Sequence, residues 1–309
     1  YQVRSVQGKG LGAVATRFIP AGTEVIGDYP VVMVDDLAVR GRRLGLDGGK
    51  AKLERLVARA VGEGLDGESK RYFGGLSGRD SDDEEEGWEL KVFGKNAFRV
   101  KVKVPTERDG QEEKVFHVVF RDVSRVNHDC SPNMGYYFDQ RTLRQRVVAA
   151  RDIEPGEELS IGYVDLTKPS SDRQKLLHDS WGFTCTCRRC TLPTRENEES
   201  DYRAEQIHTL LKELDDYSSL EASPEKAELL VRLYEAEGIQ ARIYEAYYRA
   251  ALEWNGVGNS NKAVMHARLC LEKGSSLRSE ESPFLVIMRR LIENPGEHWS
   301  WGFRLRLTG

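Results

Sequence analysis

Three cysteines lie close together in the stretch CTCRRC, at Cys185, Cys187 and Cys190. Neighbours separated by only one or two residues are poorly placed to form relaxed disulfides with one another. Thiolates crowded in this way suit a tetrahedral zinc ion, which takes four ligands in a structural site. The stretch supplies three, so the fourth ligand must come from elsewhere, and the candidates are Cys130, Cys270 or one of the six histidines. The fold therefore has to bring a distant segment to residues 185–190.

The composition bounds the class of protein. The chain has 309 residues, 39% hydrophobic and 31% charged, as is ordinary for a folded chain with one large domain or two smaller ones. A net charge of −4 argues against bulk attraction to DNA, so we expect no sequence-specific nucleic-acid binding. No apolar run approaches the roughly 18–20 residues that cross a bilayer, so we expect no membrane partner. The absence of an Asn-x-Ser/Thr acceptor favours an intracellular protein of the nucleus or the cytoplasm.

The N-terminal third reads as strands followed by an interruption. Residues 1–35 alternate apolar runs with turns, as in GKGLGAV and VIGDYPVVMV, which predicts strands joined by tight turns. Residues 36–95 change character and look like an insertion with a helix and an acidic run at 80–87, which predicts a solvated loop. The predicted buried face of that helix carries Leu53, Leu56, Val57 and Ala60.

Strand signals return after the insertion. KVFGKNAFRVKVKV (91–104) and VFHVVF (115–120) predict two strands separated by a polar turn. The polar turn NHDCSPN (127–133) is followed by the strand candidates RQRVVAA (144–150) and ELSIGYVD (158–165). Up to Cys190 we expect only short strands and loops.

Beyond about Arg195 the periodicity becomes helical, which makes the chain α+β. The apolar positions predict four amphipathic helices, marked by Ile207, Leu210, Leu211 and Leu214, by Ser223-Pro224 to Gly238, by Ile243 to Trp254, and by Ala263, Ala267 and Cys270 up to Gly274. Short links between them suggest antiparallel pairs. Their small-residue faces resemble tetratricopeptide packing, although no clean repeat period is visible.

Four stretches in this order resemble the SET-domain lysine methyltransferases. They are GKGLGAVATRFIPAGTEVI (8–26), RVNHDCSPN (125–133), PGEELSIGYVD (155–165) and WGFTCTCRRC (181–190). The helical last third makes the SET and MYND branch the nearest resemblance. It implies a β-rich SET core with a zinc-stapled post-SET tail, followed by a tetratricopeptide-like helical domain. The corresponding boundaries are 1–35 for the first strands, 36–95 for the insertion, 96–165 for the SET core, 166–194 for the tail and 195–309 for the helical domain.

The resemblance also implies a cofactor and a site. The cofactor would be S-adenosylmethionine, and the residues implied to bind it are Lys9, Gly10, Leu11, Asn96, Asn127, His128, Tyr163 and Phe183. Tyr163 would also stand at the methyl-transfer centre as the catalytic residue. Cys130 would join Cys185, Cys187 and Cys190 on a structural zinc ion. One or two of the aromatic residues 136–138 would line the channel of the substrate lysine.

Plainer interpretations stand beside these roles. Tyr163 could pack in the core, His128 could only hold its turn, and Asn96 could be a turn residue. His266 and Cys270, spaced i and i+4, could hold a metal but more simply pack on a helix.

The chain also departs from the branch in three places. Residues 36–95 contain no cysteine, so the MYND zinc module is absent. Asp129 replaces the usual Ser beside His128. Ile161 stands where an aromatic residue often limits the number of methyl groups added, and an aliphatic residue leaves room for more than one.

The sequence therefore predicts a monomeric protein-lysine N-methyltransferase that acts on a lysine of a histone or non-histone protein or peptide. The alternative is a non-catalytic SET-like scaffold that binds partner proteins through its helical domain. Retention of Tyr163, Asn127, His128 and the four cysteines favours the enzyme.

Overall fold

The computed structural model describes residues 1–43, 49–78, 87–106 and 110–308. The described strands form small sheets in which β1 pairs with β2, β9 lies between β3 and β8, β6 lies between β4 and β5, and β10 runs parallel to β7. Their bounds are β1 (Gln2–Val6), β2 (Gly10–Val14), β3 (Glu24–Asp28), β4 (Pro30–Asp35), β5 (Phe98–Pro105), β6 (Gln111–Phe120), β7 (Asn127–His128), β8 (Met134–Asp139), β9 (Arg144–Ala149) and β10 (Ser160–Ile161). The expected strands at residues 1–35 are thus confirmed as β1 to β4.

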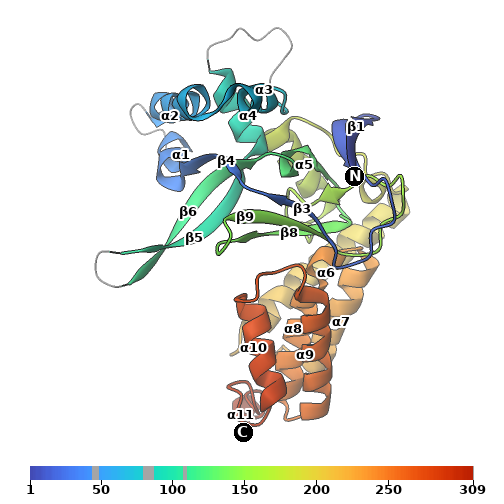
Figure 1. The fold of residues 1–309 in the computed structure, drawn as a ribbon. Helices are drawn as coiled ribbons and strands as arrows, with labels where there is room; N and C mark the ends of the chain where they lie inside the picture. The colour runs from blue at the N-terminus through green and yellow to red at the C-terminus, as the bar shows by residue number, and fades with distance from the viewer. Residues whose placement is uncertain (44–48, 79–86, 107–109, 309) are drawn as a thin grey trace.

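Helices lie on both sides of these sheets. In Figure 1, α1 to α4 gather above the strands, and α7 to α10 form a separate helical body below them. The bounds are α1 (Asp36–Arg43), α2 (Gly49–Gly64), α3 (Gly67–Gly74), α4 (Trp88–Asn96), α5 (Ser170–Trp181), α6 (Thr194–Asp215), α7 (Pro224–Ala236), α8 (Ile243–Gly256), α9 (Ser260–Gly274), α10 (Pro283–Glu293) and α11 (Leu305–Thr308). None of the helices in the described ranges combines the length and hydrophobicity that a bilayer span requires.

The core of the strand-rich part is built from alternating side chains. On β5, Val100 and Val102 are buried, whereas Arg99, Lys101 and Lys103 between them are exposed. This alternation is the period of a strand with one face in the core. The buried valines join the same apolar cluster as residues from β2, β6, β8 and β9. A separate cluster holds the insertion helices α2 to α4 against β4 and β6.

The helical body follows the expected pattern closely. The helix predicted from Ser223-Pro224 begins there as α7, with the Ser223 side chain accepting a hydrogen bond from the Lys226 N–H. The structure extends α6 back to Thr194 and adds α10, which was not predicted. Helices α8 and α9 pack against each other, and α10 packs on α9. The tetratricopeptide-like character of this body stays a prediction.

Three expectations about local structure were wrong. Residues 91–96 were predicted as strand but belong to α4, where Val92, Phe93 and Asn96 are buried on one helical face. Leu56, expected on the buried face of α2, is 42% exposed, because that face runs through Leu53, Val57 and Val61. The segment before Cys190 is not only strands and loops, since it contains α5. The predicted acidic loop at 80–87 lies, except for Gly87, outside the described residues.

Candidate functional site

One cavity of about 470 Å³ gathers the residues implied to bind the cofactor. It lies where the β1–β2 turn, the end of α4, β7, the segment after β10 and the tail after α5 meet. Its lining includes Lys9, Gly10, Leu11, Asn96, Asn127, His128, Tyr163 and Phe183. These eight residues span 175 positions of the chain, from 9 to 183, and the fold brings all of them to this one cavity.

Glu158 links two walls of this cavity, although the sequence analysis gave it no role. Its carboxylate lies 2.7 Å from the Lys9 ammonium and accepts a 2.8 Å hydrogen bond from the Asn127 amide. The same amide donates to the Leu11 carbonyl at 3.2 Å. The glycine-rich turn is therefore tied to β7 through one carboxylate. Its position inside the stretch PGEELSIGYVD was the only available signal.

Gly12 permits this close approach. A Cβ built at this position would lie 2.6 Å from the Asn127 amide nitrogen and 2.9 Å from the Glu158 carboxylate. Contacts that short are excluded by sterics, so a side chain here would displace the ends of the Asn127 and Glu158 side chains and disturb their hydrogen bond. Gly12 stands within the stretch GKGLGAV, where the sequence does not reveal its contacts with distant residues.

Asn96 closes another side of the cavity. Its side chain is buried, and the amide nitrogen donates to the Ser77 and Val92 carbonyls, each at 2.7 Å. These bonds hold the end of α4 against the preceding loop. Both the structural interpretation and the cofactor-binding interpretation of this residue therefore remain compatible with its position.

His128 faces the cavity on one side and a cysteine on the other. Its Nδ1 accepts a 3.0 Å hydrogen bond from the Tyr163 N–H, so the ring hydrogen resides on Nε2. Nε2 lies 3.3 Å from the Cys130 sulfur and donates toward it. Burial above all lowers the pKa of His128 to about 4, which keeps the ring neutral near pH 7.

Tyr163 also lines the cavity. Its hydroxyl donates a 2.7 Å hydrogen bond to the Val126 carbonyl. Its ring lies 5.4 Å from that of His128 and 5.2 Å from that of Trp181, measured between centroids. Burial, followed by the charge of Glu158, raises the pKa of Tyr163 above its ordinary value. The phenol therefore stays protonated and offers its oxygen lone pairs to a group in the cavity.

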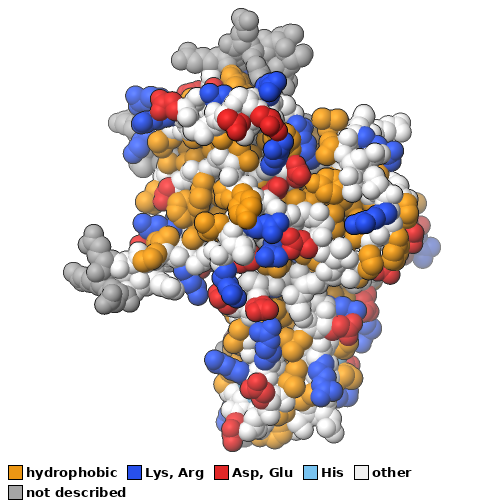
Figure 2. Space-filling view, viewed as in Figure 1, with side chains coloured by type: hydrophobic (Ala, Val, Ile, Leu, Met, Phe, Trp, Pro, Cys, Tyr) orange, Lys and Arg blue, Asp and Glu red, His pale blue; other side chains and the backbone are white. Residues whose placement is uncertain are grey.

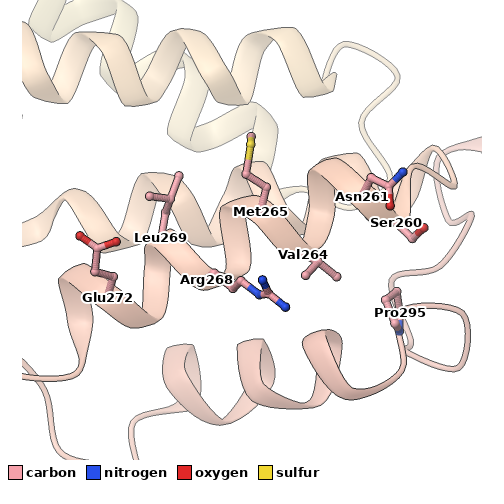
Figure 3. A pocket seen from close by; sticks show the side chains of 8 residues that line it. All are labelled: Ser260, Asn261, Val264, Met265, Arg268, Leu269, Glu272 and Pro295. Carbon is pink, nitrogen blue, oxygen red and sulfur yellow. The ribbon is translucent and has the colours of Figure 1, made fainter.

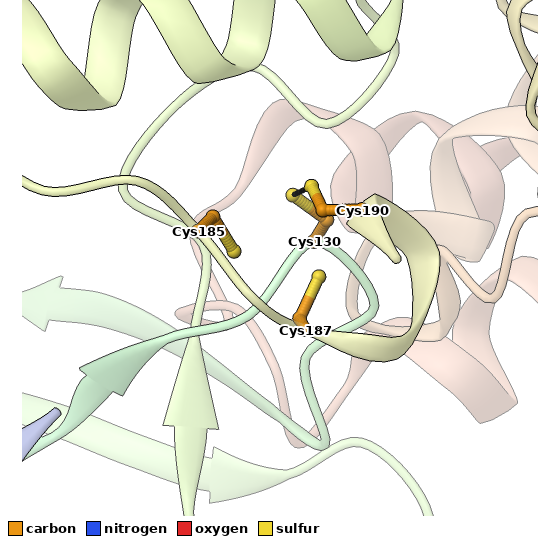
Figure 4. A group of neighbouring side chains, drawn as sticks. All are labelled: Cys130, Cys185, Cys187 and Cys190. Carbon is orange, nitrogen blue, oxygen red and sulfur yellow. Dashed lines mark hydrogen bonds between the residues drawn. The ribbon is translucent and has the colours of Figure 1, made fainter. Parts of the chain in front are cut away.

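The four cysteines of the predicted metal site form one cluster. Their sulfur atoms all lie within 4.8 Å of one another, and those of Cys130 and Cys190 are 3.5 Å apart. Figure 4 shows the sulfurs of Cys130, Cys185, Cys187 and Cys190 directed toward a common centre. A tetrahedron with zinc–sulfur bonds of about 2.3 Å has sulfur atoms about 3.8 Å apart. The donor set and its spacing therefore fit zinc.

The surroundings of the cluster suit a metal held by thiolates. Hydrogen bonds from Cys130 and Cys185 lower the pKa of Cys187 to about 5, whereas hydrogen bonds with the other three cysteines raise that of Cys130. The fully buried Arg173 directs its Nε to the Cys130 sulfur at 3.3 Å, and Arg189 donates to the Cys130 carbonyl at 3.2 Å. Zinc bound by four thiolates keeps a net negative charge, which the buried Arg173 guanidinium beside the Cys130 sulfur would partly offset.

Of the other candidates for the fourth ligand, His128 lies beside the cluster but donates to the Cys130 sulfur, and Cys270 lies elsewhere. Cys270 is buried on α9 among apolar residues of the helical body. Within the described ranges, Cys130 and the three tail cysteines are the one group of three or more metal-binding side chains whose ligand atoms meet. His266 and Cys270 form no such group there.

A hollow on the helical body differs from this site. It has a volume of about 870 Å³ and lies along α9. Figure 3 shows Val264 and Arg268 on one side of that helix and Met265 and Leu269 on another, so these side chains do not converge. No residue predicted for the site lines it.

Comparison with known protein families settles the class. The family model described as "SET domain" matches residues 10–164, half of the chain. The chain belongs to the SET-domain family. The matched region contains the cavity residues from Gly10 to Tyr163 and the Cys130 turn, whereas the cysteine tail follows it.

Individual relatives match shorter pieces of this SET-domain protein. N-lysine methyltransferase SMYD2 of Gallus gallus is 40% identical over 96 residues, which cover 30% of this chain and 22% of the relative. Histone-lysine N-methyltransferase set5 of Schizosaccharomyces pombe is 44% identical over 85 residues, which cover 27% of each. The matches thus span about a quarter of these curated relatives. The recognised resemblance to SET-domain lysine methyltransferases near the SMYD branch is confirmed.

A solved structure aligns over the whole length at low similarity. It is titled "Crystal structure of the SET domain of LSMT bound to Lysine and AdoHcy", and the alignment covers 99% of this chain and 90% of that one. The sequences are 13% identical and the TM-score is 0.33, so this likeness carries no argument about the site.

Proposed function

We propose that this chain is an S-adenosylmethionine-dependent protein-lysine N-methyltransferase. Membership of the SET-domain family supports this, as do segments similar to two lysine methyltransferases. The observation that carries the proposal is the convergence of eight residues from distant segments, Tyr163 among them, on one cavity. When bound, S-adenosylmethionine supplies a methyl group carried on a positively charged sulfur.

The lysine acceptor has to be neutral to accept a methyl group. A free lysine has a pKa near 10.4, so deprotonating it at pH 7 costs about 4.6 kcal/mol. Burial in an apolar channel lowers that cost, because desolvation disfavours the ammonium ion. Aligning donor and acceptor then contributes about 7–11 kcal/mol toward the barrier.

Tyr163 suits the acceptor for a specific reason. Its hydroxyl hydrogen is engaged by the Val126 carbonyl, which leaves the phenol oxygen as an acceptor for an N–H of the lysine amine. Because its raised pKa keeps the phenol neutral, it orients the amine without holding it as an ammonium ion. A carboxylate at this position would favour the charged form instead.

We also propose that zinc binds Cys130, Cys185, Cys187 and Cys190 as a structural ion. The tail between Trp181 and Thr186 forms one wall of the cavity, and Gln174 of α5 exchanges two 2.8 Å hydrogen bonds with the backbone of Cys185. A metal joining this tail to the Cys130 turn would fix that wall. The ion would act through the fold, since all four positions are filled by protein ligands.

The substrate would enter between the strand-rich part and the helical body. A groove of about 920 Å³ lies there, and Tyr136, Tyr137 and Phe138 of β8 line it. Tyr136, which lines this groove, contributes to the raised pKa of Tyr163, which lines the cofactor cavity. We therefore assign the lysine channel to the region between these two tyrosines. A monomeric state and an intracellular location remain part of the proposal.

The test combines cofactor binding with methyl transfer. Calorimetry should detect S-adenosylmethionine binding, and a labelled methyl donor should label a lysine peptide library. Tyr163→Phe should keep the binding and lose the labelling. If the protein neither binds the cofactor nor labels any peptide, the scaffold interpretation replaces this proposal.

A further inference from the structure

The groove beside β8 is lined by charged side chains, and only some of them form ion pairs. Four of the charged residues that line it pair with one another. Lys101 pairs with Glu113 at 2.7 Å, and Arg146 pairs with Asp139 at 3.1 Å. Arg278 lies 3.4 Å from Glu245. Figure 2 shows Lys, Arg, Asp and Glu side chains mixed at the waist between the upper and lower parts of the molecule.

The uncompensated cations lie on the side of the groove formed by strands. Arg99 and Lys103 occupy alternate exposed positions of β5, and Arg141 lies in the turn between β8 and β9. None of the three has an acidic partner within 4.0 Å among the residues that the structure describes. The Gln140 side chain bonds to the backbone of Lys103, which holds β5 beside this turn. We call these three side chains the cationic wall.

The uncompensated anions lie on the helical side. Glu280 and Glu281 are exposed in the link between α9 and α10, and both line the groove. Within the described part of the chain, neither carboxylate has a basic partner within 4.0 Å. Glu280 is close enough to Tyr137 of β8 to contribute to its electrostatic environment. We call these two side chains the acidic wall.

Aromatic residues of β8 line the groove together with both walls. Tyr136, Tyr137 and Phe138 lie on β8, and the ring of Tyr136 packs edge-on against Phe98 at 5.4 Å. Apolar rings of this kind suit the aliphatic stem of a lysine, while charges at the rim select the residues around it. A segment lying across β8 would therefore meet opposite charges on its two sides.

Resting on the proposed methyltransferase function, we infer that the groove selects a lysine within a segment of split charge. Acidic side chains would flank the lysine on the side of the cationic wall, and basic side chains on the side of the acidic wall. The substrate class is thus a polyampholyte peptide rather than a uniformly basic tail. A uniformly basic segment would satisfy the acidic wall and be repelled by the cationic wall.

The test uses a peptide library with one central lysine and randomised flanks. Methylated members are identified by mass spectrometry, and the kcat/KM of selected peptides is measured. An exposed ion pair contributes on the order of 2- to 5-fold, so peptides with both charge preferences should exceed neutral ones by roughly 10-fold. The preference should shrink at high salt, since rim charges are screened.

Reversing the charges of each wall tests which wall causes which charge preference of the substrate. Arg99→Glu with Lys103→Glu should reverse the acidic preference, and Glu280→Lys with Glu281→Lys should reverse the basic one. Lys70→Glu and Glu293→Lys each reverse one charge, in the same direction as the matching wall variant, at exposed sites outside the groove and should leave both preferences unchanged. Cofactor binding by calorimetry should be equal in all variants.

The outcomes distinguish failure of the charge preference from failure of the proposed methyltransferase function. Methylation that is indifferent to flanking charge, or preferences that persist in the wall variants, would overturn the inference alone. If the wild type binds the cofactor but methylates no library member, the proposed function fails and the inference fails with it.

Discussion

Removing the carboxylate of Glu237 should destabilise the protein more than the loss of one surface ion pair. This side chain is 1% exposed at the end of α7, and it accepts hydrogen bonds from Ser200 at 2.7 Å and Arg203 at 2.6 Å. Oε2, the oxygen that accepts from Ser200, also lies 2.5 Å from Nη2 of Arg189, whose side chain is 4% exposed. The Nη2 hydrogen is poorly aligned with that oxygen, so the contact is mainly electrostatic. The Glu237 carbonyl also accepts from Ser131, beside the Cys130 turn.

The magnitude follows from this burial. Glu237→Ala leaves the Arg189 guanidinium buried without its counterion, which costs about 3–5 kcal/mol. The unfolding entropy of a 309-residue chain is about 0.65 kcal/mol/K, so Tm should fall by roughly 5–8 °C. Arg203→Ala is the matched control, because its side chain is 30% exposed and its loss should cost about 1 kcal/mol or less.

The assay is calorimetric unfolding of the wild type, Glu237→Ala, Glu237→Gln and Arg203→Ala. Glu237→Gln keeps the shape but removes the charge, so it should lose most of the same free energy. Because Arg189 also bonds to the Cys130 carbonyl, a chelator should extract zinc faster from both Glu237 variants. A Glu237→Gln protein as stable as the wild type would refute the reasoning.

Three further outcomes follow from the same structure. Cys130→Ser should lower bound zinc from one ion per chain toward none and weaken cofactor binding, whereas Cys270→Ser should retain the metal; equal metal content in both would contradict the four-ligand site. Tyr163→Phe should reduce kcat by about 10²–10⁴-fold and leave cofactor binding unchanged. It should also lower the unfolding free energy by about 1 kcal/mol, because the Val126 carbonyl loses its hydrogen-bond donor. A fully active variant would show that the phenol takes no part in the mechanism. Burial lowers the pKa of His266 below its ordinary value of 6.5, so the unfolded chain binds more protons and the stability present above pH 6.5 declines as the pH falls below it. His266→Leu should flatten that decline in denaturant titrations, and an unchanged pH dependence would assign it to other groups.

Local sequence patterns predicted the regular parts of the fold well where burial and period agree. The Ser223-Pro224 start of α7 and the one-sided burial of β5 follow from capping and alternation. The pattern failed at residues 91–96, because a short apolar run fits a strand and a helix equally, and packing against α2 decides for the helix. The pattern also failed at α5. Arg173 is buried there, but an arginine in a sequence suggests a surface position, so the buried face of the helix was not recognised.

The site shows the same division. The motif residues Asn127, His128 and Tyr163 were identifiable from the sequence because they lie in short continuous motifs that follow one another in a fixed order along the chain. Glu158 and Gly12 were missed, since their importance lies in contacts with residues far along the chain. Glu158 joins Lys9 to Asn127, and Gly12 makes room for that junction.

The sequence by itself determined the family, the cysteine set and the alternation of strands with helices, because short-range spacing and periodicity are carried by neighbouring residues. Only the tertiary structure decided which buried charges compensate one another, such as Arg189 with Glu237, and which remain exposed across the groove. Electrostatic energy depends on distance and burial in space, and neither quantity is written in the order of residues along the chain.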